Sequence, residues 1–270
     1  MAVTDVWIQH PTLRFLRQDS FAQVLRWTGQ SVPDEELSID LTVAMMDEGD
    51  VDRAFICAWY DASGPIVGND EVAGFVAAHP DRLVGVASVD LRDPVAAVRE
   101  LRRAVRDLGF RALRIMPWIW GLPPNHRLYY PLYAECVELG IPFMTQVGHT
   151  GPTRSSEPGR PIPYLDDVAL DFPDLTIVAG HIGYPWTTEM IALATKYPNV
   201  HIDTSAYAAH RYPKELVEYM RGHGRRKVLF GSDYPMLTAG KALRHLDLLE
   251  LDQEATDLFL HGNADRLFPR

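Results

Sequence analysis

Cysteine is scarce in this sequence: only Cys57 and Cys136 occur among 270 residues, and both lie in apolar stretches. Two thiols allow one disulfide at most, which excludes the disulfide framework of small secreted proteins. Long apolar runs are lacking too, since no window reaches the roughly 18 uninterrupted apolar residues of a transmembrane helix. Residues 1–5 show no basic segment that leads into an apolar one, so no signal peptide is predicted. We expect a reduced, cytoplasmic protein that does not associate with a membrane.

Positive charge is also in short supply. The formal net charge is −10 and the pI is about 5.4. Phosphate backbones repel a chain of this charge, so no nucleic-acid partner is expected. The densest basic patch, at residues 221–227, is interpreted as a solvated helix end. The expected partner is a small-molecule substrate, and the aromatic segment with Phe15, Phe21 and Trp27 packs either on the rest of the chain or on a second copy in a homodimer.

The sequence does contain enough apolar material for one large domain. Hydrophobic residues make up 47% and charged residues 23%, which is ordinary for a globular protein. A length of 270 residues suits a single α/β barrel, which needs about 250. The proline-rich stretch 116–131 is aromatic, and a flexible linker would not be. We therefore expect one domain over residues 1–270.

Short apolar runs recur along the whole chain. They are rich in Val, Ile, Leu and Phe, and they are nearly continuous in apolar character. Parallel strands that are covered on both faces have this pattern. The predicted strands are Thr4–Gln9, Arg53–Ala58, Leu83–Val89, Ala112–Met116, Pro142–Val147, Leu175–Gly180, Val200–Thr204 and Lys227–Gly231.

Amphipathic segments separate these strands. Val98, Leu101 and Val105 recur at helical spacing with Arg and Glu between them, and Gly109 follows as a C-cap. Strands that alternate with helices form βαβ units, and eight such units close most naturally into a (β/α)8 barrel of the TIM type. The active site is then expected at the carboxyl ends of the strands. The predicted helices are Pro94–Leu108, Tyr130–Leu139, Asp166–Phe172, Thr187–Tyr197, Lys214–Gly222 and Thr238–Glu250.

Two polar residues stand directly after apolar strands. His181 ends the run TIVAGH, and Asp233 ends the run VLFGSD. A histidine and a carboxylate at the mouth of one barrel can share a proton, bind a divalent metal or activate water. The alternative is a buried histidine that a carboxylate satisfies for structural reasons. Because both residues end strands and both precede a proline-containing turn, we favour a catalytic role for them.

The long loop 148–163 adds further candidates. His149 lies between two glycines, which suits a loop that approaches a ligand closely, and it is predicted to assist catalysis. Arg154 and Arg160 follow in the same loop, and either one could clamp a substrate carboxylate. A loop salt bridge with Glu157 is an equally good interpretation of these two arginines.

Other residues carry weaker signals. Asp203 ends the seventh predicted strand, where it either orients a neighbour by hydrogen bonding or caps the next helix. Trp118 and Trp120 are candidate walls of an apolar pocket, unless the loop simply folds on its own aromatic residues. His10 follows the first strand, but strand alternation places it on the face opposite Gln9.

Five motifs together resemble a known enzyme family. They are GHIG at 180–183, PW at 185–186, IDTS at 202–205, FGSDYP at 230–235 and GNADRLF at 262–268. In this order they resemble the amidohydrolase-related family, in the branch of aminocarboxymuconate semialdehyde decarboxylase, γ-resorcylate decarboxylase and several lactone hydrolases. The resemblance covers nearly the whole chain and implies a distorted (β/α)8 barrel.

The resemblance also implies a metal site, with a His-x-His pair on the first strand, histidines on the fifth and sixth, and an aspartate on the eighth. Only His181 and Asp233 match this pattern, whereas Trp7 and Gln9 stand at the pair and Gln146 on the fifth strand. A carboxamide is a poor ligand for zinc, and an indole is none. No cofactor is therefore favoured. The alternative is a Zn²⁺ or Mn²⁺ site rebuilt from His10, His149, His181 and Asp233.

The leading hypothesis is a hydrolase that acts on a small cyclic or carboxylated substrate of the lactone type. Asp233 is expected to act as a general base, and His181 to polarise a carbonyl or donate a proton. The second hypothesis is a decarboxylase or other lyase that acts on an aromatic or unsaturated carboxylic acid. The third is a non-catalytic protein that binds a metabolite. The residues expected to contact the substrate are Trp7, Gln9, Gln146, Arg154, Arg160, Trp118 and Trp120.

Overall fold

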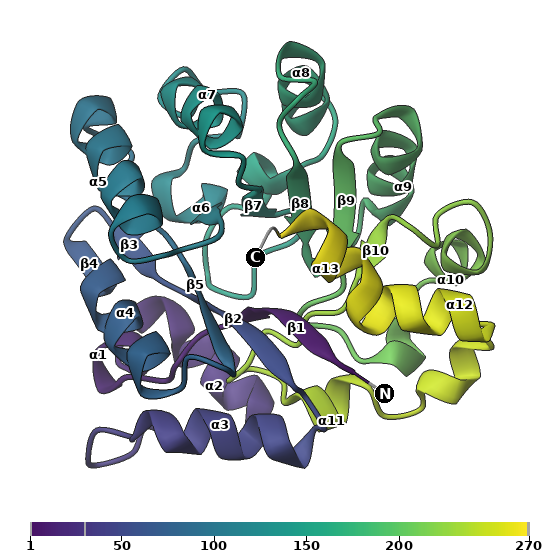
Figure 1. Ribbon diagram of the computed structural model, residues 1–270, viewed down its shortest axis with the longest axis horizontal. Helices are drawn as coiled ribbons and strands as arrows, with labels where there is room; N and C mark the ends of the chain where they lie inside the picture. The colour runs from purple at the N-terminus through teal and green to yellow at the C-terminus, as the bar shows by residue number, and fades with distance from the viewer. Residues whose placement is uncertain (1, 30, 269–270) are drawn as a thin grey trace.

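A computed structural model describes residues 2–29 and 31–268, and eight parallel strands form its centre. The strands lie in the middle of Figure 1, with the helices in a ring around them. Their residues are almost all buried, which explains why they read as continuous apolar runs. The strands are β1 (Thr4–Ile8), β2 (Arg53–Cys57), β5 (Leu83–Val86), β6 (Leu113–Ile115), β7 (Phe143–Gln146), β8 (Ile177–Gly180), β9 (Val200–Asp203) and β10 (Val228–Leu229).

The strands close into a barrel. One sheet has the order β1-β2-β5 and the other β6-β7-β8-β9-β10. A parallel bridge between Ala87 and Leu113 joins β5 to β6, and another between Ile8 and Tyr234 joins β1 to β10. The amide of Val6 also donates to the carbonyl of Phe230 at 3.0 Å. All eight predicted strands are confirmed, and so is the (β/α)8 barrel.

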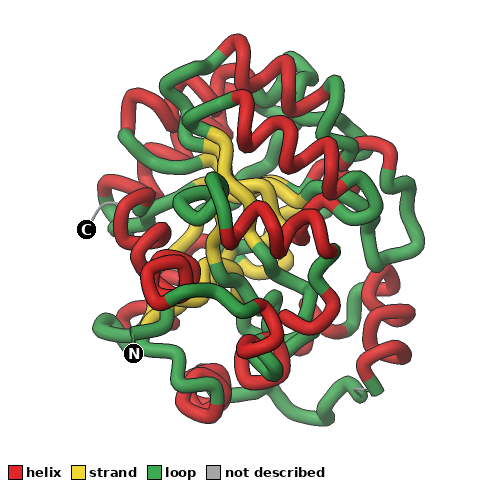
Figure 2. Tube along the Cα trace, turned by 90° about the vertical axis from the view of Figure 1, so that its right-hand side faces the viewer, coloured by secondary structure: helices red, strands yellow, loops and turns green. Residues whose placement is uncertain are grey.

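Helices occupy the connections between the strands and cover their outer side, which Figure 2 shows from the side. In α5 (Pro94–Arg106), Asp93 is the N-cap and accepts from the amides of Val95 and Ala96, while Pro94 begins the helix. The other α-helices are α1 (Leu13–Leu16), α2 (Ala22–Thr28), α3 (Ile39–Glu48), α4 (Asn69–Ala78), α6 (Pro117–Trp120), α7 (Tyr130–Leu139), α8 (Tyr164–Asp171), α9 (Thr187–Lys196), α10 (Lys214–Arg221), α11 (Ala239–Ala242), α12 (Gln253–Asp257) and α13 (Asn263–Leu267).

The helix predicted over Thr238–Glu250 is wrong as one element. Helix α11 ends at Ala242, His245 adopts a left-handed conformation with φ of 64°, and a 3-10 turn covers Leu246–Leu249. Leu243, Leu246 and Leu249 are three residues apart, a spacing that a 3-10 turn also brings onto one face. Helices α1 to α4 and a hairpin of β3 (Trp59–Asp61) and β4 (Gly64–Val67) are present without having been predicted.

The end of the barrel at which the strands begin is covered by the C-terminal helices. The ring of Phe268, after α13, lies 4.3 Å from that of Phe55 on β2. Arg53, the first residue of β2, forms an ion pair with Asp265 at 2.7 Å. The opposite end, where the strands finish, is therefore the open one. Within the described residues no helix combines the length and apolar character needed to cross a bilayer.

Candidate active site

A cavity of about 440 Å³ opens at the carboxyl ends of the strands. Its polar lining comes from residues at the ends of four strands: Gln9 after β1, Gln146 on β7, His181 after β8 and Asp233 after β10. His149, from the loop after β7, adds a second imidazole. This is the position at which (β/α)8 enzymes carry their active sites.

The rest of the lining is largely apolar and aromatic. Helix α2 and the turn before it contribute Val24 and Phe21, so this part of the N-terminal aromatic segment packs on the barrel, while Trp27 is 61% exposed. The volume falls in the range of pockets that hold small organic molecules. The cavity therefore suits a flat, unsaturated ligand with a polar end. The main apolar side chains around it are Phe21, Trp59, Trp118, Tyr207, Met236 and Leu237.

The carboxyl group of Asp233 lines the cavity and is held by Gln9 through one of its two oxygens. Gln9 Nε2 donates to its Oδ1 at 3.1 Å, and its side chain is 13% exposed. Burial raises the pKa of Asp233 to about 7, while the hydrogen bond from Gln9 and the charge of Arg114 act in the opposite direction. Near neutral pH both protonation states are populated, so this carboxyl can act as a general acid or as a general base.

His181 faces Asp233 across a short gap. Its Nδ1 lies 2.6 Å from Ser205 Oγ, which leaves Nε2 directed toward Asp233 Oδ2 at 3.8 Å. That distance is too long for a direct hydrogen bond, so a ligand atom can contact both groups. Burial, followed by the charges of Arg114 and His149, lowers the pKa of His181 to about 3. The imidazole is therefore neutral at pH 7.

The backbone at this edge of the barrel is strained at several residues, three of which line the cavity. His181, Ala206 and Asp233 adopt positive φ angles of 69°, 67° and 68°. A non-glycine residue in this region costs about 1–3 kcal/mol and persists where the surroundings over-determine it. All three residues line the cavity, which is the place where such strain supports a functional role.

Two further buried carboxyls lie beneath the cavity. Asp203 accepts a hydrogen bond from the amide of Ser205, the residue that contacts His181. Of the two interpretations of Asp203, this contact corresponds to the orientation of a neighbour. Burial raises the pKa of Asp203 to about 8 and that of Asp5 to about 6. Asp203 is therefore mainly protonated at neutral pH, and Asp5 mainly ionised.

Both carboxamides of the site are already engaged by the protein. Gln9 donates to Asp233 and, at 2.6 Å, to the carbonyl of Tyr234. Gln146 Oε1 accepts from Trp118 Nε1 at 2.6 Å, and its Nε2 donates to the carbonyl of His149 at 2.9 Å. Gln146 and Trp118 thus meet at the cavity wall.

Several of the other sequence candidates lie elsewhere. His10 cannot join the proposed rebuilt metal site, because its Nδ1 contacts Thr42 Oγ1 at 2.8 Å and its Nε2 the carbonyl of Leu37 at 2.9 Å. Trp7 is completely buried below the cavity, with its ring 5.3 Å from that of His181. Trp120 lies outside the cavity, where the guanidinium of Arg92 is 6.0 Å from its ring centre.

The two loop arginines are also outside the cavity. Arg160 forms an ion pair with Glu189 at 3.0 Å and lies 5.8 Å from the ring centre of Trp186. Neither contact is the salt bridge to Glu157 that the sequence suggested. Arg154 lines a smaller neighbouring depression on the other side of Trp118. The arginine that does line the cavity, Arg211, follows β9 and was not among the sequence candidates.

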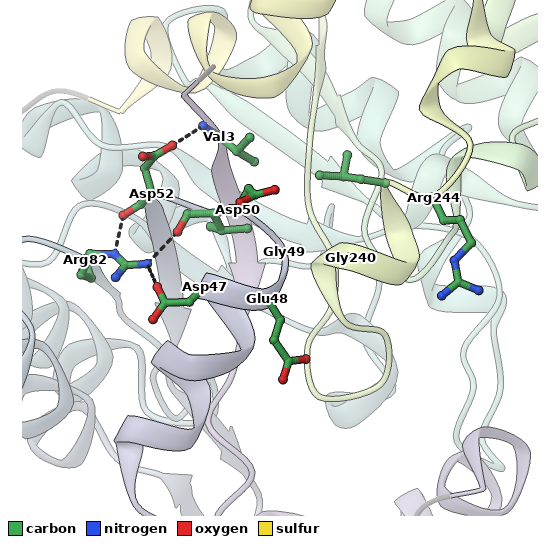
Figure 3. Close-up of a pocket in the computed structure, with 11 residues that line it drawn as sticks. Val3, Asp47, Glu48, Gly49, Asp50, Asp52, Arg82, Gly240 and Arg244 are labelled. Carbon is green, nitrogen blue, oxygen red and sulfur yellow. Dashed lines mark hydrogen bonds and ion pairs between the residues drawn. The ribbon is translucent and has the colours of Figure 1, made fainter.

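A larger depression lies at the opposite end of the barrel. It measures about 1090 Å³ and is formed where β1 and β2 begin, next to the end of α3 (Figure 3). Arg82 donates there to Asp47 at 2.7 Å and to the carbonyl of Asp52 at 2.9 Å. Its lining does not include the paired carboxyl and imidazole groups described above, so the chemistry belongs at the strand ends.

Comparison with protein families and curated proteins gives consistent results. A family model described as amidohydrolase matches residues 45–270. The chain is 26% identical over 249 residues to a γ-resorcylate decarboxylase from Rhizobium sp., covering 74% of each protein. It is also 26% identical over 243 residues to a 2-keto-4-carboxy-3-hexenedioate hydratase from Sphingobium sp., covering 75% of this chain and 70% of the hydratase.

Solved structures show the same fold. An uncharacterized TIM-barrel protein from Bordetella bronchiseptica superposes with a TM-score of 0.84 at 26% identity, over 99% of this chain and 98% of that one. A 5-carboxyvanillate decarboxylase from Novosphingobium aromaticivorans, solved with bound manganese, superposes with a TM-score of 0.70 at 17% identity. That match covers 99% of this chain and 96% of the decarboxylase, and at this identity it shows the fold alone.

Proposed function

The chain belongs to the amidohydrolase family and is an enzyme, and on that premise we propose that it removes CO₂ from a small aromatic or unsaturated carboxylic acid. One observation carries the proposal. A carboxyl group that is partly protonated at neutral pH, Asp233, faces a neutral imidazole, His181, at the polar end of an aromatic-walled cavity. The similarity to a γ-resorcylate decarboxylase supports this choice of reaction.

In the proposed reaction the protonated Asp233 donates to the substrate carbon that bears the carboxylate. The bond between this carbon and the carboxylate then breaks, its electron pair returns to the unsaturated system, and CO₂ leaves as a neutral molecule. Asp233 is left ionised and regains a proton from solvent, so one proton is consumed for each CO₂ released. A positioned general acid of this kind contributes about 10²–10⁴-fold to the rate.

His181 and the aromatic walls have separate tasks in this scheme. His181 Nε2 hydrogen-bonds a substrate oxygen, while Ser205 holds the ring through Nδ1. Trp59 and Trp118 pack against the faces or edges of the unsaturated ligand. Orientation by these groups places the carbon to be protonated beside Asp233 Oδ2, and such positioning lowers the barrier.

Hydrolysis is the leading hypothesis when only the sequence is considered, and His181 and Asp233 could also activate water. We rank decarboxylation above it because the γ-resorcylate decarboxylase similarity extends over 249 residues. The two reactions leave different products. Carboxyl-¹³C-labelled 2-hydroxybenzoic acids and a panel of δ-lactones, incubated with the protein in ²H₂O, separate them.

Labelled CO₂, with one deuterium on the carbon that lost it, is the result expected for a decarboxylase. Lactone opening with no CO₂ from any acid would replace the proposal with the hydrolase hypothesis. No turnover of either panel would contradict both, and would favour a protein that only binds its ligand.

A metal ion of the kind bound by the manganese-containing decarboxylase does not fit the residues of this site. No group of three or more His, Cys, Asp or Glu side chains that could hold a metal ion occurs in residues 2–29 and 31–268. Gln9 and Gln146 direct their polar atoms to protein partners, and the guanidinium of Arg114 supplies positive charge below the cavity. We therefore propose a reaction that needs no resident metal.

Removal of metal is accordingly expected to leave the rate unchanged. Protein purified without chelator should contain substoichiometric zinc and manganese by elemental analysis, and dialysis against a chelator should change kcat by less than about twofold, far below the loss that follows removal of a required metal. Near-stoichiometric metal whose removal abolishes turnover, and whose return restores it, would contradict the proposed metal-free site.

A further inference from the structure

A buried arginine lies directly below the cavity. Arg114, on β6, is only 1% exposed, and its guanidinium is sandwiched between two indoles. The guanidinium carbon is 4.9 Å from the ring centre of Trp7 and 4.6 Å from that of Trp59. Cation–π contacts offset only part of what burial of the charge costs.

This arginine lacks the partner that a buried cation normally has. Within the described residues, no ion pair joins Arg114 to a carboxylate, and its Nε has no hydrogen-bond acceptor. Its other nitrogens donate to neutral oxygens: Nη1 to Gln9 Oε1 at 3.0 Å, and Nη2 to the carbonyl of Ala58 at 3.2 Å. Arginine stays protonated in proteins, so the charge remains uncompensated by a direct contact. Such a costly arrangement indicates a functional role.

The link from Arg114 to the cavity runs through Gln9. Gln9 Oε1 accepts from Arg114 and from Trp59 Nε1 at 3.2 Å, which forces Gln9 Nε2 toward Asp233 Oδ1. The amide can therefore adopt only one orientation. Arg114 in this way holds the proton-transferring carboxyl in place without contacting a ligand itself.

The charges around Asp233 make the cation necessary for an anionic ligand. Asp5 on β1 adds negative charge to its surroundings, whereas Asp203 on β9 is mainly protonated and His181 after β8 is neutral. The thiol of Cys57 on β2 is protonated, because burial raises its pKa. Arg211 also lines the cavity, but it is exposed to solvent, which screens its charge. Without Arg114 the cavity floor would carry only the negative charge of Asp5 and of ionised Asp233, which would repel a carboxylate.

We infer that Arg114 is the buried cation beneath this site, and that it both orients Gln9 toward Asp233 and admits a carboxylated ligand beside that acid. The inference deepens the proposed function, because it assigns the ligand as an anion. It makes Arg114 a positioning residue and a determinant of specificity. Arg114 then neutralises ligand charge, as a bound metal ion does in other enzymes.

Ligand binding without turnover tests this inference. Benzoate and benzamide have nearly the same shape and differ in charge, and calorimetry measures the affinity of each for the full chain. The wild type is expected to prefer benzoate. Arg114→Met and Arg114→Gln should each weaken benzoate binding by roughly tenfold or more and change benzamide binding by less than about twofold. Arg92→Met, which removes an exposed guanidinium beside Trp120, is the matched control and should alter neither affinity.

Arg114→Gln removes the charge but retains an amide donor near the position of Nε, whereas Arg114→Met removes the charge and every donor. Equal losses for benzoate and benzamide would indicate structural damage and overturn the inference, as would retention of the benzoate preference in the Gln variant. A wild type that binds benzoate no more tightly than benzamide would overturn it without any variant. The proposed function is tested separately by CO₂ release from the wild type. If the wild type releases no CO₂ but the Arg114 variants lose the benzoate preference, only the decarboxylase assignment is refuted.

Discussion

Asp233→Asn is expected to lower kcat by about 10²–10⁴-fold, because the amide cannot deliver the proton that the reaction consumes. The substitution is nearly isosteric, and the new side chain would still accept from Gln9 through its carbonyl oxygen. In the wild type, kcat/KM should be level below pH 7 and fall about tenfold per pH unit above it, since the pKa of Asp233 is about 7 and the protonated form is the active one. The measurement is steady-state CO₂ release across this pH range.

Asp233→Asn should lose activity but gain stability relative to the wild type as the pH rises. The pKa of Asp233 is raised from 3.8 to about 7 in the folded protein, so its contribution to stability is complete below pH 3.8 and is lost as the pH rises to 7. Each unit of this shift corresponds to about 1.4 kcal/mol. Urea unfolding should therefore show that the stability of Asp233→Asn relative to the wild type increases between pH 4 and pH 7.

The matched control is Asp203→Asn. Asp203 is a fully buried carboxyl with a pKa raised to about 8, and it does not line the cavity. Its replacement should also raise relative stability with pH, up to about pH 8. Because Asp203 acts only through Ser205 and His181, its replacement should lower activity far less than Asp233→Asn does. An Asp233 variant with a normal rate would show that Asp233 is not the proton donor. An Asp203 variant as inactive as the Asp233 variant would show that the loss does not single out the carboxyl that lines the cavity.

The barrel could be predicted from sequence because its strands are buried on both faces. Every predicted strand overlaps an observed one, and the ends differ by only a few residues. Strand alternation also placed Gln9 correctly, facing the cavity, and His10 away from it on Thr42 and Leu37. Local periodicity is sufficient for such assignments, since it depends only on which neighbours in the chain are apolar.

Arg114 shows where this reasoning stops. It is the one charged residue inside the predicted strand Ala112–Met116, and that signal was available. Its meaning depends on Trp7, Gln9 and Trp59, which are distant from it in sequence. Only the closed barrel brings these side chains together, and no local pattern encodes the contact.

The arginine that lines the cavity could not be predicted from the sequence either. Arg154 and Arg160 follow His149 closely in sequence, whereas Arg211 lines the cavity from the loop after β9. A long loop has no periodicity, so its direction is set by tertiary contacts such as the ion pair of Arg160 with Glu189. Residues that directly follow strands are the ones whose position a barrel prediction can specify.

His181→Asn is expected to reduce kcat by about 10²–10⁴-fold. The shorter side chain keeps a polar group near Ser205 but withdraws the group that Nε2 presents 3.8 Å from Asp233. Because His181 is neutral at pH 7, with a pKa lowered to about 3, its loss should not move the alkaline limb of the pH profile. Because Asp233 alone determines the alkaline limb, CO₂ release should decrease by the same factor at every pH from about 5 to about 9.

His201→Asn provides the comparison that separates this role from that of an ordinary buried histidine. His201 is the second residue of β9 and, like His181, it is buried. Its pKa is also lowered to about 3, mainly by burial and further by the charges of Lys227 and Arg266. It does not line the cavity, so its replacement should alter unfolding more than turnover. Equal loss of activity in both variants would mean that His181 only fills space. A selective loss in the His181 variant would assign it to the substrate oxygen, because only that imidazole of the two shares the cavity with Asp233.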